Sequence, residues 1–171
     1  MKVSYAPIGM TKGTPPSGFQ VDHNRIALGT GRDVFEQACR AVRAWRMFDL
    51  GWVSVYDRSV PFAQGMPVAI LAKVFGLWFL NACRIVYTLE ERSGKVWRYG
   101  FAYGTLPAHL ERGEERFLIE WERRSDMVWY DILAYSQPNV WLAKGGYPVV
   151  RLFQKHFGRD SKRVMASLMV D

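Results

Sequence analysis

Hydrophobic positions change their period along the chain, and these changes divide it into helical and extended segments. Between Asp33 and Phe48, apolar residues recur three and four apart, as on the buried face of an amphipathic helix. Thr30 precedes this segment and has Asp33 three residues further on, the spacing of a capping box. We therefore predict a helix over 33–48 that starts at a Thr30 cap and follows a short strand over 21–29.

Six segments after this helix alternate in polarity or consist of β-branched and aromatic residues, as strands do. They begin at Trp52, Val68, Ala82, Lys95, Glu114 and Met127. The connections over 92–94 and 123–126 are of hairpin length, so these segments should form an antiparallel meander.

Helical spacing returns after Pro138, where apolar residues recur mostly three, four or seven apart. A short turn or helix over 140–144 should precede the long helix, and Gly158 is a position for a kink. The predicted fold is α+β: a curved antiparallel sheet of about six or seven strands wrapped around a long C-terminal helix. This helix-grip arrangement leaves a cavity between sheet and helix.

Length and composition predict one ordered domain over 1–171, with an N-terminal loop over 1–19 and a C-terminal helical segment over 138–171. Nearly half of the residues are apolar, 49%, which excludes a disordered chain. Cys39 and Cys83 have no metal or redox spacing and should be buried thiols. The most apolar stretch, 67–83, is too short and too interrupted to span a bilayer. We expect a soluble, cytoplasmic protein.

The net charge of +7 permits contact with an anionic partner. The basic residues are densest in the C-terminal segment: Lys144, Arg151, Lys155, Arg159, Lys162 and Arg163. A solvated helix face explains such a run, and the alternative is a peripheral site for an anionic membrane or nucleic acid. Nucleic acid is the less favoured partner.

The richest candidate chemistry lies in the stretch YGFAYGTLPAHLERGEERF, over 99–117. Strand alternation places Tyr103 on a bulky face and Gly104 on a nearly bare one, where curvature or a close approach is expected. In the predicted loop over 106–113, His109 and Glu111 are two apart, so a carboxylate could orient the imidazole for acid–base catalysis.

Three interpretations of this stretch stay open. His109 with Glu111 or Glu115 could act as acid and base, or His109 and the carboxylates could hold a metal. Alternatively the glutamates form a structural network neutralised by Arg112 and Arg116. The spacing matches no strong metal signature, and no phosphate loop or nucleophile elbow occurs. We therefore predict no metal and no cofactor.

Aromatic residues occur in nearly every predicted element, and cavities for small molecules are mostly apolar and aromatic with a few polar groups. We take as candidate ligand-binding residues Tyr103, Thr105, His109, Glu114, Trp78, Arg84 and Tyr135.

Several motifs together resemble a known family. These are YAPIG with PPSGF, LGTG followed by FEQACRAVRAW and GWV, then YGFAYGTLPAHLERGEERF, and finally AYSQP. They resemble the bacterial and plant family called domain of unknown function 1990, essentially from end to end. The resemblance implies a fold similar to START-like and polyketide-cyclase-like ligand carriers, and it implies no established activity.

On this resemblance a shared function would lie at the matching motif positions, which are Tyr103, Gly104, Thr105, Leu106, Pro107, His109, Glu111, Gly113, Glu114, Glu115 and Phe117. Gln137 departs from the pattern, since an arginine is more usual there. If that arginine held an anionic ligand group, this chain would not bind the same ligand.

Our leading hypothesis is a module that binds a hydrophobic small molecule or lipid in the cavity. The alternatives are an enzyme, a cyclase, dehydratase or hydrolase, using His109 with Glu111 or Glu115, and a peripheral binder acting through the basic C-terminal helix.

Overall fold

Seven strands form one antiparallel sheet in the order β1-β7-β6-β5-β4-β3-β2. The computed structural model describes residues 2–107, 109, 111–138 and 147–170, and the side chains of 147–150 lie outside that description. The strands are β1 (Gln20–Thr30), β2 (Val53–Val55), β3 (Pro67–Val74), β4 (Leu77–Glu91), β5 (Val96–Thr105), β6 (Glu111–Glu122) and β7 (Met127–Pro138). The helices are α1 (Gly31–Arg43) and α3 (Tyr147–Ser167), with two 3-10 turns, η1 (Met10–Lys12) and η2 (Arg46–Phe48).

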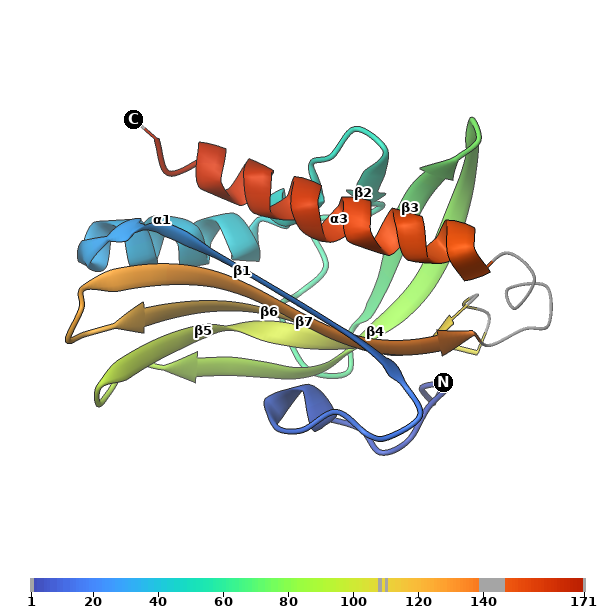
Figure 1. The fold of residues 1–171 in the computed structure, drawn as a ribbon, viewed down its shortest axis with the longest axis horizontal. Helices are drawn as coiled ribbons and strands as arrows, with labels where there is room; N and C mark the ends of the chain where they lie inside the picture. The colour runs from blue at the N-terminus through green and yellow to red at the C-terminus, as the bar shows by residue number, and fades with distance from the viewer. Residues whose placement is uncertain (1, 108, 110, 139–146, 171) are drawn as a thin grey trace.

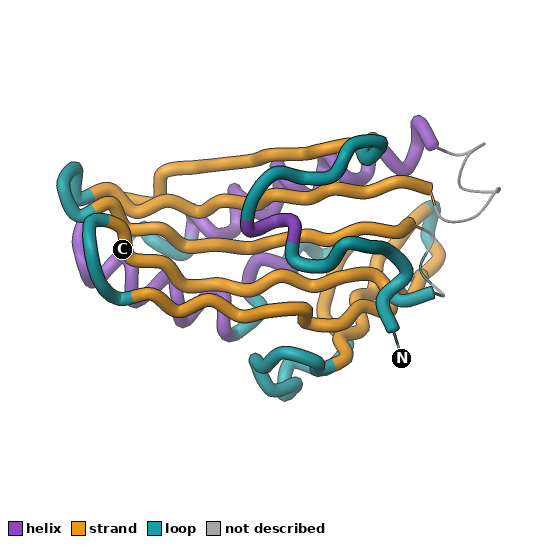
Figure 2. The backbone as a smooth tube through the Cα atoms, turned by 90° about the horizontal axis from the view of Figure 1, so that it is seen from below, coloured by secondary structure: helices purple, strands orange, loops and turns teal. Residues whose placement is uncertain are grey.

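The sheet separates two layers that differ in kind. Both α1 and α3 lie on one face, which we call the inner face, and the N-terminal segment with η1 crosses the other, outer face (Figures 1 and 2). The predicted α+β helix-grip fold is thereby confirmed, because a curved antiparallel sheet holds a long C-terminal helix.

The predicted first helix is wrong at its C-terminal end. It ends at Arg43, and Trp45 then adopts a left-handed conformation with φ 59°, which turns the chain into η2. This turn carries Trp45 and Phe48 into the core, where both are fully buried. Thr30 occupies the N-cap position as predicted, but its side chain makes no capping hydrogen bond.

Two strands begin earlier than predicted. Cross-strand pairing with β7 extends β6 back to Glu111, so residues 111–113 of the predicted loop over 106–113 belong to the strand. Pairing with β3 extends β4 back to Leu77. The helix α3 runs through Gly158 without interruption. The short turn or helix predicted over 140–144 lies outside the described residues.

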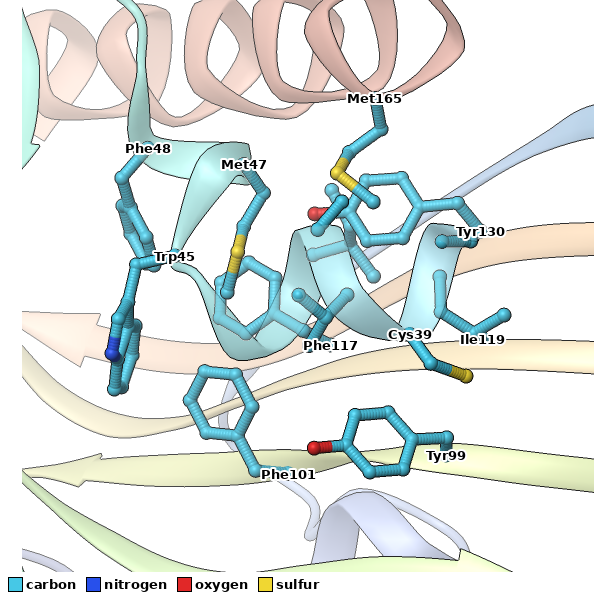
Figure 3. Close-up of a cluster of buried hydrophobic side chains, with 14 of the residues drawn as sticks. Cys39, Trp45, Met47, Phe48, Tyr99, Phe101, Phe117, Ile119, Tyr130 and Met165 are labelled. Atoms are coloured by element: carbon cyan, nitrogen blue, oxygen red, sulfur yellow. The ribbon is translucent and has the colours of Figure 1, made fainter. Parts of the chain in front are cut away.

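The core fills one end of the inner face. Ring contacts join η2 to the middle of the sheet, with Trp45 4.9 Å from Phe101 and Phe48 5.3 Å from Phe117, between ring centroids. Figure 3 shows these rings under α1 and η2, with Met165 of α3 closing the cluster from above. The other end of the inner face, beneath the first turns of α3, lies outside this core.

The N-terminal segment, predicted as a loop, packs closely on the outer face. Tyr5 and Thr11 are buried there, and Ser4 donates its backbone N–H to the carbonyl oxygen of Thr105. A Cβ atom at Gly104 would lie 2.2 Å from the hydroxyl oxygen of Tyr5. The sequence predicts either curvature or a close approach at this bare strand face, and at Gly104 the structure shows a close approach by the Tyr5 side chain.

Candidate functional site

A cavity of about 300 Å³ lies between the inner face of the sheet and α3, and it opens to solvent. Its wall is mostly apolar and comes from β2, β3, β4, β7 and α3, with Trp52, Ile70, Phe79, Ile132, Phe153 and Phe157 among its members. Polar groups gather at the end near β5 and β6, where the lining includes Tyr103, Thr105, His109, Glu111, Glu115 and Gln154. The cavity thus has an apolar body and one polar end.

Glu115 and Tyr103 form a buried pair at the polar end. They are directly opposite each other on β6 and β5, and the Tyr103 hydroxyl donates to Glu115 Oε2 at 2.6 Å. Burial raises the pKa of Glu115 to about 7, because desolvation disfavours the charged carboxylate. The pKa of Tyr103 is raised well above its usual value, also by burial. Near neutral pH this carboxyl group can therefore either accept or donate a hydrogen bond.

Glu111 joins α3 to the sheet beside this pair. Its two carboxyl oxygens accept hydrogen bonds from Gln154 Nε2 at 2.7 and 2.8 Å, and one of them also accepts from the Ser136 hydroxyl at 3.2 Å. Burial raises the pKa of Glu111 as well. One turn of helix earlier, Arg151 pairs with Asp22 of β1, which fixes this end of α3 over the cavity.

His109 contacts the backbone of Glu111 through Nδ1, and the role of a carboxylate in orienting its imidazole stays a prediction. Nδ1 of His109 accepts the backbone N–H of Glu111 at 3.0 Å. The carboxyl group of Glu111 points to Gln154 and Ser136. Burial lowers the pKa of His109 to about 4, so the imidazole is neutral at physiological pH. His109 lines the cavity as a neutral polar group.

Glu114 contributes to the opposite face although its backbone borders the cavity. Its carboxyl oxygens accept hydrogen bonds from the Tyr5 hydroxyl at 2.7 Å and from the backbone N–H groups of Gly9 at 2.7 Å and Thr11 at 3.0 Å. The Thr11 hydroxyl also donates to it. These contacts hold the N-terminal segment on the sheet, and the ligand-binding role of Glu114 stays a prediction.

Tyr135 belongs to this outer-face arrangement too. It is opposite Glu114 in the β6–β7 pairing, and its hydroxyl donates to the carbonyl oxygen of Pro7 at 3.1 Å. The predicted neutralisation of the glutamates by arginine is also corrected. Arg116 pairs with Asp131 at 2.6 Å, and Arg112 is exposed.

Trp78 and Arg84 do not line the cavity. Trp78 lies near the tip of the β3–β4 hairpin with half of its surface exposed, 51%. Arg84 is opposite Gly104 in the β4–β5 pairing, so its side chain leaves the sheet on the outer face, beside Tyr5. Of the predicted ligand-binding set, the cavity lining includes Tyr103, Thr105, His109, Glu114 and Tyr135, while the Glu114 carboxyl and Tyr135 hydroxyl groups bond to the N-terminal segment.

Sequence reasoning missed the part of the polar end that comes from β1, β7 and α3. Asp22, Asn24, Ser136 and Gln154 line the cavity, yet they are far from the 99–117 stretch in the chain. Gln154 looks like an ordinary surface residue of a helix in the sequence, and its role in the cavity appears only once α3 is packed on the sheet. Within the described ranges, no group of three or more His, Cys, Asp or Glu side chains could hold a metal ion.

The family model described as Domain of unknown function (DUF1990) matches residues 4–164. The chain belongs to this family. Among curated relatives, the UPF0548 protein of Dictyostelium discoideum is 44% identical over 153 residues, which cover 85% of this chain and 70% of that protein. The UPF0548 protein of Arabidopsis thaliana is 35% identical over 150 residues, covering 86% of this chain and 72% of that protein. The resemblance noted from the motifs is confirmed.

Solved structures with low sequence identity share the fold of this DUF1990 member. A hypothetical protein of Helicobacter pylori superposes with a TM-score of 0.60 at 13% identity, covering 99% of both chains. A norcoclaurine synthase mutant from Thalictrum, in complex with a transition-state analogue, gives a TM-score of 0.50 at 9% identity, covering 88% of this chain and 94% of the other. At these identities the likeness establishes the START-like helix-grip fold alone. Within the described part of the chain, no helix is long and apolar enough to cross a membrane.

Proposed function

We propose that this protein binds a hydrophobic small molecule or lipid in the cavity between the sheet and α3. The observation that carries the proposal is the asymmetry of the cavity, which has a mostly apolar wall and a polar cluster built around Glu115 and Tyr103. Its volume of about 300 Å³ lies at the lower end of the range for ligand pockets. Such a site orients a ligand by placing its polar group at one end.

The charges at the polar end favour a ligand head group that is neutral or cationic. Glu111 and Glu115 line the cavity there, and no lysine or arginine is among its described lining residues. Arg151, the nearest cation named above, is paired with Asp22. A hydroxyl or amine can donate to Glu115, whereas an anionic head group would be repelled by the carboxylates.

A cavity-filling substitution tests the proposal. Ala134 is opposite Glu115 on the inner face and lines the cavity, so Ala134→Trp should occupy the space that a ligand needs. Ala63, on an exposed turn, is the matched control site for Ala63→Trp. Native mass spectrometry of freshly purified protein should show a co-purified ligand in the wild type and in Ala63→Trp, and none in Ala134→Trp.

Binding of the neutral apolar dye Nile red gives a second readout for the same variants. Dodecylamine and dodecanol should displace the dye at lower concentrations than dodecanoate, which has the same chain length and an anionic end. Equal dye binding by wild type and Ala134→Trp, with no co-purified ligand, would contradict the proposal.

An enzymatic function is the second candidate, and one observation favours it. Glu115 faces the cavity with a pKa of about 7, the property of a general acid or base that works near neutral pH. The candidate acid is then Glu115 with Tyr103 rather than His109. Incubation of the extracted ligand with wild type and Glu115→Gln tests it, since conversion by the wild type alone supports catalysis and an unchanged ligand in both argues against it. The cytoplasmic location stays a prediction.

A further inference from the structure

The tip of the β3–β4 hairpin carries the largest concentration of exposed apolar side chains in the described structure. Their exposed fractions are Phe75 85%, Leu77 66%, Leu80 58%, Trp78 51% and Phe79 41%. Figure 1 shows this hairpin projecting away from the rest of the sheet, near the first turns of α3. Contiguous exposed apolar groups of this kind mark an interaction surface.

The apolar groups project from both faces of the hairpin. Residues 77–80 are consecutive in β4, so their side chains alternate between the two faces, and all four are exposed. A folded protein partner with a flat surface would cover only one of these faces. The fluid interface of a lipid bilayer surrounds an inserted hairpin and covers both.

The charge around the hairpin is complementary to an anionic surface. From residue 58 to residue 89 the sequence contains no aspartate or glutamate, and Lys73 lies in that range. Lys73 is on the hairpin itself, with its ammonium group 5.8 Å from the centre of the Trp78 ring. Tryptophan and lysine side by side are typical of the boundary between lipid head groups and acyl chains.

The first turns of α3 extend this surface. Phe75 at the hairpin tip contacts Phe153 of α3, with 6.3 Å between ring centroids. Next to Phe153, Leu152 is 52% exposed, and Lys155 is exposed one turn further on. The contact between Phe75 and Phe153 thus places this turn of α3, with its exposed apolar and basic residues, next to the hairpin tip.

We propose that this surface, formed by the β3–β4 hairpin tip together with Leu152 and Lys155, docks the protein on an anionic lipid bilayer. Val74 and Phe79 of the hairpin also line the cavity, so docking places this wall of the cavity beside the membrane. A membrane-derived ligand could then enter without crossing water, which is the one part of the inference that rests on the proposed function.

Flotation with vesicles tests the docking surface. We expect the wild type to bind phosphatidylcholine vesicles that contain about one third phosphatidylserine, and to bind pure phosphatidylcholine at least tenfold more weakly. The double variant Phe75→Ser/Leu77→Ser should lower binding to the anionic vesicles at least tenfold, and Lys73→Glu should lower it severalfold. Added salt should weaken binding, because the ionic contribution is screened.

Tyr56, an exposed aromatic residue outside the hairpin, provides the matched control. Tyr56→Ser should change vesicle binding less than twofold. The substituted hairpin residues are exposed, so the variants should keep the wild-type melting temperature, and a retained melting temperature shows that a binding loss is not caused by unfolding.

Three outcomes would overturn the inference: no binding of the wild type to anionic vesicles, equal binding by the hairpin variant, or a stable dimer in solution that the hairpin variant abolishes. The Ala134→Trp variant separates the two proposals. It should bind vesicles as the wild type does while lacking a cavity ligand. A wild type that keeps its cavity ligand but does not bind anionic vesicles would remove only the docking surface.

Discussion

Glu114 and Glu115 are adjacent on β6, yet their carboxyl groups serve opposite faces of the sheet. Glu115 accepts from Tyr103 at the polar end of the cavity, and Glu114 accepts from Tyr5 at 2.7 Å on the outer face. Strand alternation makes this division possible. One glutamate thereby anchors the N-terminal segment, and the other contributes to the candidate ligand site.

Replacing Glu114 should release the N-terminal segment. Glu114→Gln keeps the size of the side chain but turns one acceptor into a donor facing the backbone N–H groups of Gly9 and Thr11. We expect a loss of about 3 kcal/mol in the free energy of unfolding, measured by urea denaturation, because buried donors lose their acceptor. Tyr5→Phe removes one donor and should cost about 1 kcal/mol. An unchanged urea midpoint for Glu114→Gln would show that this anchor does not stabilise the fold.

Gly104 should not tolerate a methyl group, whereas Gly158 should. A Cβ atom at Gly104 would lie 2.2 Å from the Tyr5 hydroxyl and 2.6 Å from its ring, so Gly104→Ala must displace Tyr5, at about 2 kcal/mol. A Cβ atom at Gly158 meets the amide end of Asn24 at 2.7 Å, a group that can rotate away.

In α3, alanine gains about 1 kcal/mol over glycine in helix propensity, so Gly158→Ala should be close to neutral. Thermal denaturation of the two single variants checks the contrast. In the background Tyr5→Ala, the cost of Gly104→Ala should largely disappear, and a cost that persists would mean that Tyr5 is not the obstacle.

Glu115 should make the protein less stable as the pH rises. Its pKa is about 7 in the folded state against 4.5 ordinarily, so the folded protein retains a proton that the unfolded chain releases. Stability therefore falls between pH 4.5 and pH 7 and levels off above pH 7. Glu115→Gln should remove this part of the pH dependence and exceed the wild type above pH 7, by at most about 3 kcal/mol.

Urea denaturation at several pH values measures the effect, with Glu122→Gln, at a partly exposed glutamate paired with Arg25, as the control. Parallel pH profiles for wild type and Glu115→Gln would contradict the raised pKa.

The pKa of His109 should lie far below that of an ordinary histidine. Its pKa is about 4 in the folded protein against 6.5 ordinarily, so between these pH values the unfolded chain binds a proton that the folded protein does not. This residue therefore lowers the stability of the protein as the pH falls from 6.5 to 4. Nitrogen NMR of the imidazole rings should show Nδ1 of His109 as an unprotonated acceptor until the pH approaches 4, in agreement with its hydrogen bond from Glu111. A midpoint near 6.5 would place the ring in solvent.

Local patterns determined the elements of this protein. The helical spacing after Asp33, the alternation from Lys95 to Thr105 and the return of helical spacing after Pro138 depend only on neighbours in the chain, and each predicted element is present. The α+β helix-grip architecture followed from their order. The glycine face of β5 was also recognisable from the sequence, because glycines within a strand indicate curvature or the close approach of another group.

The tertiary structure decided which face of each strand became the inside and which distant side chains met there. Alternation placed Glu114 and Glu115 on opposite faces, but only the docked helices and the N-terminal segment showed that Glu115 faces the cavity. The tertiary structure also placed Trp78 and Arg84 outside the cavity lining and Gln154 within it. These contacts join residues far apart in the chain, and their geometry depends on how sheet and helix pack, which no local sequence pattern records.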